Sequence, residues 1–221
     1  LMDGGLEDCE YLAAAMMLNP ISGCLPRQLY TLINGQRGSG KSKLLDLIAG
    51  ENPKFRLLES VTDVQGSYSA AGIRKDANRC GLGIALDEFE DKGEDRQSRA
   101  VREFLVDVRQ LTNSKQATIT RGNTENTEAT VYVLKCQIWA CSINYLRDEA
   151  DISRFMQLQT IKVEDKPMPH TVLDETFGEF TLNHFRRNLT LGMFNRAPSI
   201  LKNLAALRTH YNSSACLLYT S

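Results

Sequence analysis

The chain has 221 residues, with 26 Lys and Arg against 27 Asp and Glu, and its formal net charge is −1. Since 42% of the residues are hydrophobic and 24% are charged, the composition is that of a globular protein and excludes a disordered chain, a collagen-like fibre or a strongly basic protein. The apolar runs are too short for a membrane-spanning helix, no secretory signal is evident and the six Cys residues suggest no disulfide framework, so we expect a cytoplasmic protein without membrane contact.

Both ends of the sequence indicate a fragment. The chain begins at Leu1 and stops in a polar stretch, and residues 216–221 resemble a non-native tail, which we leave out of the fold prediction. The alternative is a natural frayed terminus.

The first half of the chain alternates helices and strands. Residues 7–19 have helical spacing and stop before Pro20, which predicts a helix outside a sheet. The strand predicted over 29–33 leads through a glycine-rich loop into a helix with one apolar face that ends at Gly50. Further elements are expected as a strand over 55–59, a helix over 70–78, a strand over 81–86 that is buried on both faces, and an amphipathic helix over 96–112.

The second half begins with alternating segments at 117–121 and 129–134, which predict a β-hairpin around a turn-rich centre. A buried strand over 136–143, a short helix or loop over 148–155 and a strand over 156–163 follow. A helix is predicted over 198–211, with Pro198 in its first turn.

These elements predict an α/β fold with a mostly parallel sheet flanked by helices. We expect an N-terminal helical segment over 1–28, a core over 29–165, and a truncated helical C-terminal extension over 166–215.

A complete P-loop pattern lies between the strand at 29–33 and the following helix. It runs from Gly35 through four residues to Gly40, Lys41 and Ser42. Glycines let backbone N–H groups turn toward phosphate oxygens, and the helix adds its positive end. Lys41 is expected to contact the β- and γ-phosphates of ATP, and the Ser42 hydroxyl to bind Mg²⁺. The alternative is a chance glycine-rich turn, and the predicted phosphate-binding residues are Gly35, Gln36, Arg37, Gly38, Ser39, Gly40, Lys41 and Ser42.

Two carboxylates directly follow the predicted strand over 81–86, as expected of a Walker B element. Asp87 is expected to hold Mg²⁺, and Glu88 to orient or deprotonate the attacking water. The alternative is an acidic loop. The acidic residues that follow are predicted to form a solvated face and comprise Glu90, Asp91, Glu94 and Asp95.

Other residues are predicted to be structural. Cys136 and Cys141 are expected in the core on opposite faces of a strand, and no Cys or His spacing indicates zinc. Arg186, Arg187 and residues 202–208 are predicted to lie on a solvated helix face, with a basic binding surface as the alternative.

The order of elements after Asp87 resembles the AAA+ group of P-loop ATPases, in which the next strand of the sheet ends in a polar sensor residue. The resemblance implies that Asn144 contacts the γ-phosphate or the water, although Asn also commonly ends a strand. It further implies that Arg154 reaches the site of a neighbouring subunit, with Arg147 and Arg74 as rivals and a surface ion pair with Asp151 as the structural alternative.

The predicted hairpin resembles the pore hairpin of superfamily 3 helicases. This resemblance implies contact with DNA, expected to be single-stranded, through Lys115 and Arg121. Glu125 and Glu128 near the tip oppose an anionic partner, and a hairpin that only covers the sheet edge is the alternative.

Residues 66–74, 86–90 and 153–155 together resemble the ATPase module of bacteriophage and plasmid primase-helicases. Membership implies a hexameric ring in the bacterial host cytoplasm, ATP-driven translocation on DNA, and a primase domain upstream. Two other classes stay open. One is a non-helicase AAA+ ATPase that loads, remodels or packages nucleic acid, and the other is a nucleotide-binding switch or kinase-like enzyme.

Overall fold

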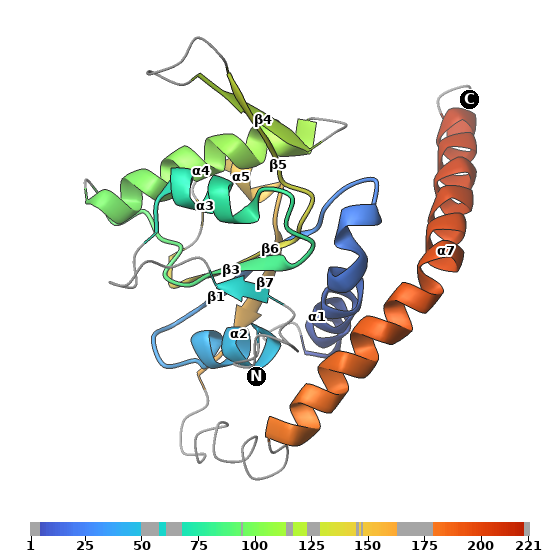
Figure 1. Cartoon of the computed structure of the whole chain (residues 1–221), viewed down its shortest axis with the longest axis horizontal. Coiled ribbons are helices and arrows are strands. Elements are labelled where there is room, and N and C mark those ends of the chain that lie inside the picture. Colours follow the sequence, from blue (N-terminus) through green and yellow to red (C-terminus); the bar gives the residue numbers. More distant parts are fainter. Residues whose placement is uncertain are drawn as a thin grey trace.

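The computed structural model describes residues 5–49, 58–60, 68–93, 95–113, 117–122, 129–144, 146, 148–162 and 179–218. A five-stranded sheet lies at the centre, and each neighbouring pair of strands is parallel (Figure 1). The predicted α/β class is therefore confirmed. The strands, in spatial order, are β2 (Leu58–Ser60), β3 (Gly83–Leu86), β6 (Ile138–Ser142), β1 (Tyr30–Gly35) and β7 (Met156–Thr160).

Helices cover both faces of the sheet because its central strands are apolar on both sides. Leu32 and its same-face neighbours pack against helices α3 (Ala70–Ala77) and α4 (Arg96–Asn113). The adjacent Ile33 packs on the opposite face, with residues of α1 (Leu6–Leu18) and α2 (Lys41–Ala49). The predictions of a helix over 7–19 outside the sheet and of a fully buried strand after residue 81 are confirmed.

The hairpin is also confirmed, and it forms its own two-stranded antiparallel sheet from β4 (Thr118–Arg121) and β5 (Thr130–Val133). Its base is bound to the turn after α3, since the Arg79 N–H donates to the Val133 carbonyl at 2.8 Å and the Val133 N–H donates to Asn78 Oδ1 at 2.9 Å. Within the described residues, the hairpin does not extend the central sheet. The glutamates predicted near its tip lie outside those residues.

Several boundaries differ from the sequence predictions. Strand β3 begins at Gly83 and not at 81, β6 spans Ile138–Ser142 and not 136–143, and β7 ends at Thr160 and not at 163. The strand expected over 55–59 is β2, at Leu58–Ser60, and residues 50–57 lie outside the described part of the chain. The segment over 148–155, expected to be a short helix or a loop, contains the helix α5 (Glu149–Ile152).

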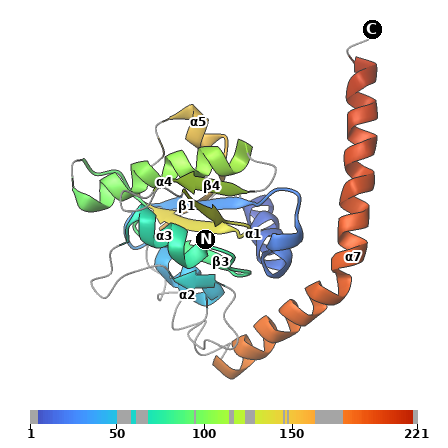
Figure 2. The ribbon, with the colours of Figure 1, turned by 45° about the horizontal axis from the view of Figure 1, so that its top comes forward.

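The C-terminal helix is much longer than expected. Helix α7 spans Glu179–Leu218, so the prediction that Pro198 lies in the first turn is wrong. A proline inside a helix removes one backbone hydrogen bond and bends the helix, and Figure 2 shows that α7 is bent. The segment before the proline stays helical because its apolar face packs on the 3₁₀ helix η1 (Asn19–Cys24), where Met193 and Ala197 are buried with Ile21.

Arg186 anchors this helix to the rest of the fold. It is buried, and its guanidinium donates to the carbonyl of Leu47 near the end of α2 and to Asn183 Oδ1 at 3.1 Å. The prediction that Arg186 belongs to a solvated face is therefore wrong, whereas Arg187 and residues 202–207 are exposed as predicted. The basic residues near Arg186 in the sequence favoured a solvated face. The helix α2 lies beside Arg186 only in the tertiary fold, which the local pattern does not indicate. In the described ranges, no helix is long and apolar enough to cross a membrane.

Candidate functional site

The glycine-rich loop connects the end of β1 at Gly35 to the start of α2 at Lys41. Gly38 and Gly40 have φ angles of 80° and 88°, in the left-handed region that favours glycine. No heavy atom lies within 4 Å of the position that a Cβ would take at either residue. The backbone conformation, and not crowding, therefore requires glycine at these two positions.

Gly35 is required for a different reason, which is the close approach of β7. A Cβ at Gly35 would lie 2.1 Å from Thr160 Oγ1 and 2.8 Å from Ser39 Oγ. Thr160 Oγ1 donates to the Asn34 carbonyl at 3.0 Å and lies 2.7 Å from Ser39 Oγ. Because the Thr160 hydroxyl has only one proton, Ser39 donates in the second contact. Thr160 thus ties the loop to the end of β7.

The Lys41 side chain folds back across the loop. Its ammonium group donates to the Gly35 carbonyl at 2.7 Å and to the Gln36 carbonyl at 3.0 Å, and the residue is buried. The Cys141 thiol of β6 donates to the Lys41 carbonyl at 3.7 Å. The first turn of α2 is therefore held against the neighbouring strand, with its lysine charge at the loop.

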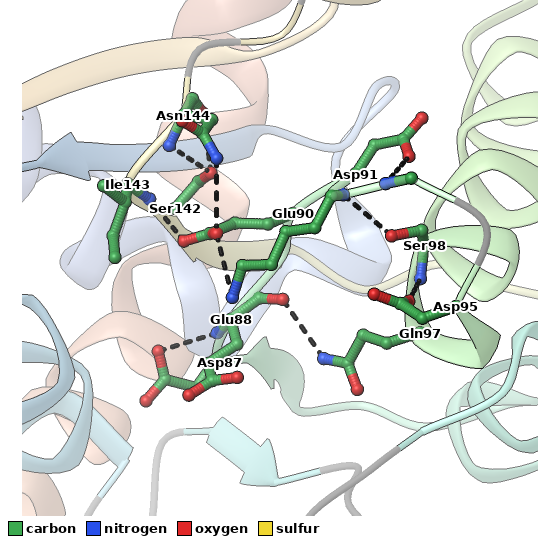
Figure 3. A network of polar contacts seen from close by, with 12 residues as sticks. Asp87, Glu88, Glu90, Asp91, Asp95, Gln97, Ser98, Ser142, Ile143 and Asn144 are labelled. Carbon is green, nitrogen blue, oxygen red and sulfur yellow. Dashed lines mark hydrogen bonds and ion pairs between the residues drawn. The ribbon is translucent and has the colours of Figure 1, made fainter.

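Asp87 and Glu88 leave the sheet at the end of β3. Glu88 has a φ of 51°, and pairing with β6 resumes at the next residue, where the Phe89 N–H donates to the Cys141 carbonyl at 2.7 Å. The Glu88 carbonyl accepts from Gln97 Nε2 at 3.1 Å (Figure 3). It also accepts from the Tyr68 hydroxyl at 3.3 Å. These contacts fix the turn while the Glu88 side chain stays exposed.

The loop and the acidic turn lie at the same edge of the sheet. Since all five strands are parallel, the carboxyl ends of β1 and β3 meet there, separated by β6, or about 10 Å at the usual strand spacing. Burial raises the pKa of the Cys141 thiol, the nearby Asp87 carboxylate raises it further, and Lys41 lowers it. The charges of both Asp87 and Lys41 therefore act on the buried Cys141 thiol of β6, the strand between β1 and β3.

The residues at this edge fit a magnesium ion. Mg²⁺ commonly takes one or two protein oxygens and completes its shell with waters and substrate phosphates. Ser42, which is exposed in the first turn of α2, and Asp87, which is partly exposed, supply a hydroxyl and a carboxylate. Both are hard oxygen donors.

Asn144, which follows β6, is brought to the acidic turn through Glu90. Asn144 Nδ2 donates to Glu90 Oε2 at 3.4 Å, and the Ile143 N–H donates to Glu90 Oε1 at 2.7 Å (Figure 3). Glu90 is only 4% exposed, so the prediction that it belongs to a solvated acidic face is wrong. The partners that hold Glu90 follow another strand, so the local sequence pattern did not indicate its burial.

Arg154, which was predicted to act on a neighbouring subunit, has hydrogen-bond partners within this chain. Arg154 Nε donates to Thr112 Oγ1 at 3.0 Å, and its Nη1 donates to the Ala150 carbonyl. Asp151 pairs with Arg109, at 2.6 Å and 2.8 Å, and not with Arg154 as the structural alternative supposed. The trans role of Arg154 stays a prediction.

Arg74 and Arg147 are the other two arginines considered for a role at a neighbouring subunit. Arg74 is buried and pairs with Asp107 at 2.6 Å and with Glu103 at 2.8 Å. Its guanidinium is therefore bound inside this chain. Arg147 lies outside the described residues.

Of the two residues predicted to contact DNA, Arg121 lies in the described part of the chain. Arg121 forms an ion pair with Asp107 of α4, so the same carboxylate serves Arg74 and Arg121. Lys115 lies outside the described residues. DNA contact by either residue stays a prediction.

Comparison with known protein families finds no family model that matches this sequence, and a search of curated proteins also finds no match.

Proposed function

We propose that this chain is a P-loop ATPase of the AAA+ type and that ATP binds at the carboxyl edge of its sheet. The glycine loop from Gly35 to Lys41 carries the proposal, because left-handed glycines, a buried lysine at the loop and a following helix are what phosphate binding requires. The hydroxyl of Ser42 and the carboxylate of Asp87 at the same edge support a magnesium-dependent reaction.

The proposed reaction is hydrolysis of ATP to ADP and phosphate. Lys41 and the loop amides bind the phosphates, and Glu88 accepts the proton of the attacking water. The water oxygen bonds to the γ-phosphorus as the bond from that phosphorus to the β–γ bridging oxygen breaks, which releases ADP. Asn144 orients the water or the γ-phosphate, and Arg154 stabilises charge at a neighbour's site. Ser42 and Asp87 would hold Mg²⁺, which supplies positive charge to the phosphate oxygens.

We further propose that hydrolysis drives movement along DNA, as the motor of a primase-helicase. The hairpin β4–β5 supports this step, because it precedes β6 and forms its own sheet beside the central one. Arg121 is held by Asp107, so its first role is to fix the hairpin on α4.

The experiment that tests the proposal is phosphate release at increasing protein concentration, with and without single-stranded DNA. A ring motor predicts that specific activity rises with concentration and with DNA, and that Arg154→Ala abolishes this rise. An Arg154→Ala chain mixed with a Glu88→Gln chain should regain part of the activity, since each supplies what the other lacks. Turnover that ignores DNA and concentration would leave the ATPase but reject the motor and the trans arginine.

Thr160→Val should weaken ATP binding roughly tenfold, or about 1.4 kcal/mol. Valine keeps the shape of the side chain but leaves the Ser39 hydroxyl and the Asn34 carbonyl without the partner they share. Titration with a fluorescent ATP analogue measures the change. Thr160→Ser retains the hydroxyl and is the matched control, and equal affinities for the Val and Ser variants would reject this role.

A further inference from the structure

Glu90 is a buried carboxylate that joins the segments following two different strands. It lies in the segment after β3 and accepts hydrogen bonds from the Ile143 N–H and the Asn144 amide in the segment after β6 (Figure 3). The Lys92 ammonium, on an otherwise half-exposed side chain, lies 3.1 Å from the same Oε2 that faces Asn144. A buried carboxylate is stable only with such partners, because burial removes its water.

The two oxygens of Glu90 have separate tasks. Oε1 accepts from the Ile143 backbone at 2.7 Å, a short contact that fixes the course of the chain after β6. Oε2 accepts from the Asn144 side chain at 3.4 Å and from Lys92. The Asn144 contact is long, as contacts between catalytic groups often are without a bound substrate.

The position of Glu90 relative to Glu88 gives these contacts a consequence. The Glu90 N–H donates to the Glu88 carbonyl at 2.8 Å, and the intervening Phe89 N–H donates to the Cys141 carbonyl of β6. The turn that contains Glu88 is thus hydrogen-bonded to β6 through Phe89. It is also hydrogen-bonded to the residues after β6 through Glu90. A shift of Glu90 would move Asn144 relative to Glu88.

We propose that Glu90 is a positioning residue for hydrolysis. Its carboxylate holds the Asn144 amide at a fixed position relative to the Glu88 turn. Asn144, which orients the γ-phosphate or the water, and Glu88, which accepts the proton, therefore stay aligned. This inference rests on the proposed ATPase function. Glu90 does not touch the substrate, and it acts through Asn144.

Glu90→Gln separates the two tasks. The glutamine carbonyl can still accept from the Ile143 N–H, but its amide nitrogen cannot accept from Asn144 or Lys92. We expect kcat for ATP to fall roughly tenfold, as is typical when a group that orients a functional residue is lost. The KM for ATP, the affinity for a fluorescent ATP analogue and the melting temperature should stay close to those of the unmodified chain.

Two further variants identify the contact that matters. Lys92→Met removes the ion pair but leaves the Asn144 contact, and it should keep kcat within about twofold, because the proposed role depends on the Asn144 contact. In a double-mutant cycle, Glu90→Gln should cost little more once Asn144 is already Ala, because the two residues act through one contact.

The outcomes are distinct. If the unmodified chain hydrolyses ATP and Glu90→Gln leaves kcat unchanged, or if its loss multiplies with that of Asn144→Ala, the positioning role is wrong while the ATPase stands. If ATP affinity and melting temperature both fall together with kcat, Glu90 is a purely structural residue and the positioning role is also wrong. A chain that binds no ATP overturns the proposed function and this inference together.

Discussion

Replacing Lys41 with Ala should reduce kcat for ATP hydrolysis by at least about 100-fold, the usual cost of removing a positioned donor from a developing negative charge. Within the described residues, the Lys41 ammonium is the one positive group that donates to the loop carbonyls of Gly35 and Gln36. Alanine removes this charge from beside the phosphates and releases both carbonyls. Steady-state phosphate release at saturating ATP measures the loss in kcat.

Lys43→Ala is the matched control, because Lys43 is an exposed lysine on the same helix, two residues away. It changes the net charge by the same amount and should alter kcat by less than about twofold. Equal losses in the two variants would indicate a general effect of charge or of helix stability and would reject a specific contact between Lys41 and phosphate.

Asp107→Ala should destabilise the folded chain by about 3–5 kcal/mol, the range found when one partner of a buried ion pair is removed. Asp107 is fully buried, and its two oxygens face the guanidinium groups of Arg74 and Arg121. Its loss would leave the buried Arg74 with Glu103 alone and would remove the ion pair between the hairpin and α4. Urea unfolding followed by circular dichroism measures the free energy of unfolding.

Glu103→Ala provides the comparison, since Glu103 binds the same arginine but its side chain is 50% exposed. Solvent screens this pair, so the loss should stay below about 1 kcal/mol. A similar, small loss in both variants would contradict a buried network centred on Asp107.

The helices and strands of the core were predictable because their signals are local. The helical spacing around Phe104 and the uninterrupted apolar run ending at Leu86 each report the faces that the element buries, and both elements have that burial in the structure. Helix α7 was not predictable in the same way. Pro198 locally favours the start of a helix, which is where the sequence analysis placed it. The packing of Met193 and Ala197 on η1, which keeps the residues before it helical, is a tertiary contact.

In the candidate site too, features made by contiguous residues were predictable, and those that depend on tertiary contacts were not. The glycine-rich loop proposed to bind phosphate was predictable because its residues are contiguous, and Gly38 and Gly40 have the left-handed backbone that favours glycine. Thr160 and Glu90 were missed as site residues, since each acts on a partner more than 50 residues away in the sequence. Their roles depend on which strands are neighbours, and a single sequence does not specify strand order.

The most direct test of an ATP site at this edge of the sheet is phosphate release from ATP by the unmodified chain, measured in Mg²⁺ and again after chelation with EDTA. We expect release that saturates with ATP in Mg²⁺ and falls to background in EDTA. A folded chain that releases no phosphate in Mg²⁺, or that releases it equally in EDTA, would contradict the assignment of Lys41, Ser42 and Asp87 to a magnesium-dependent ATPase site.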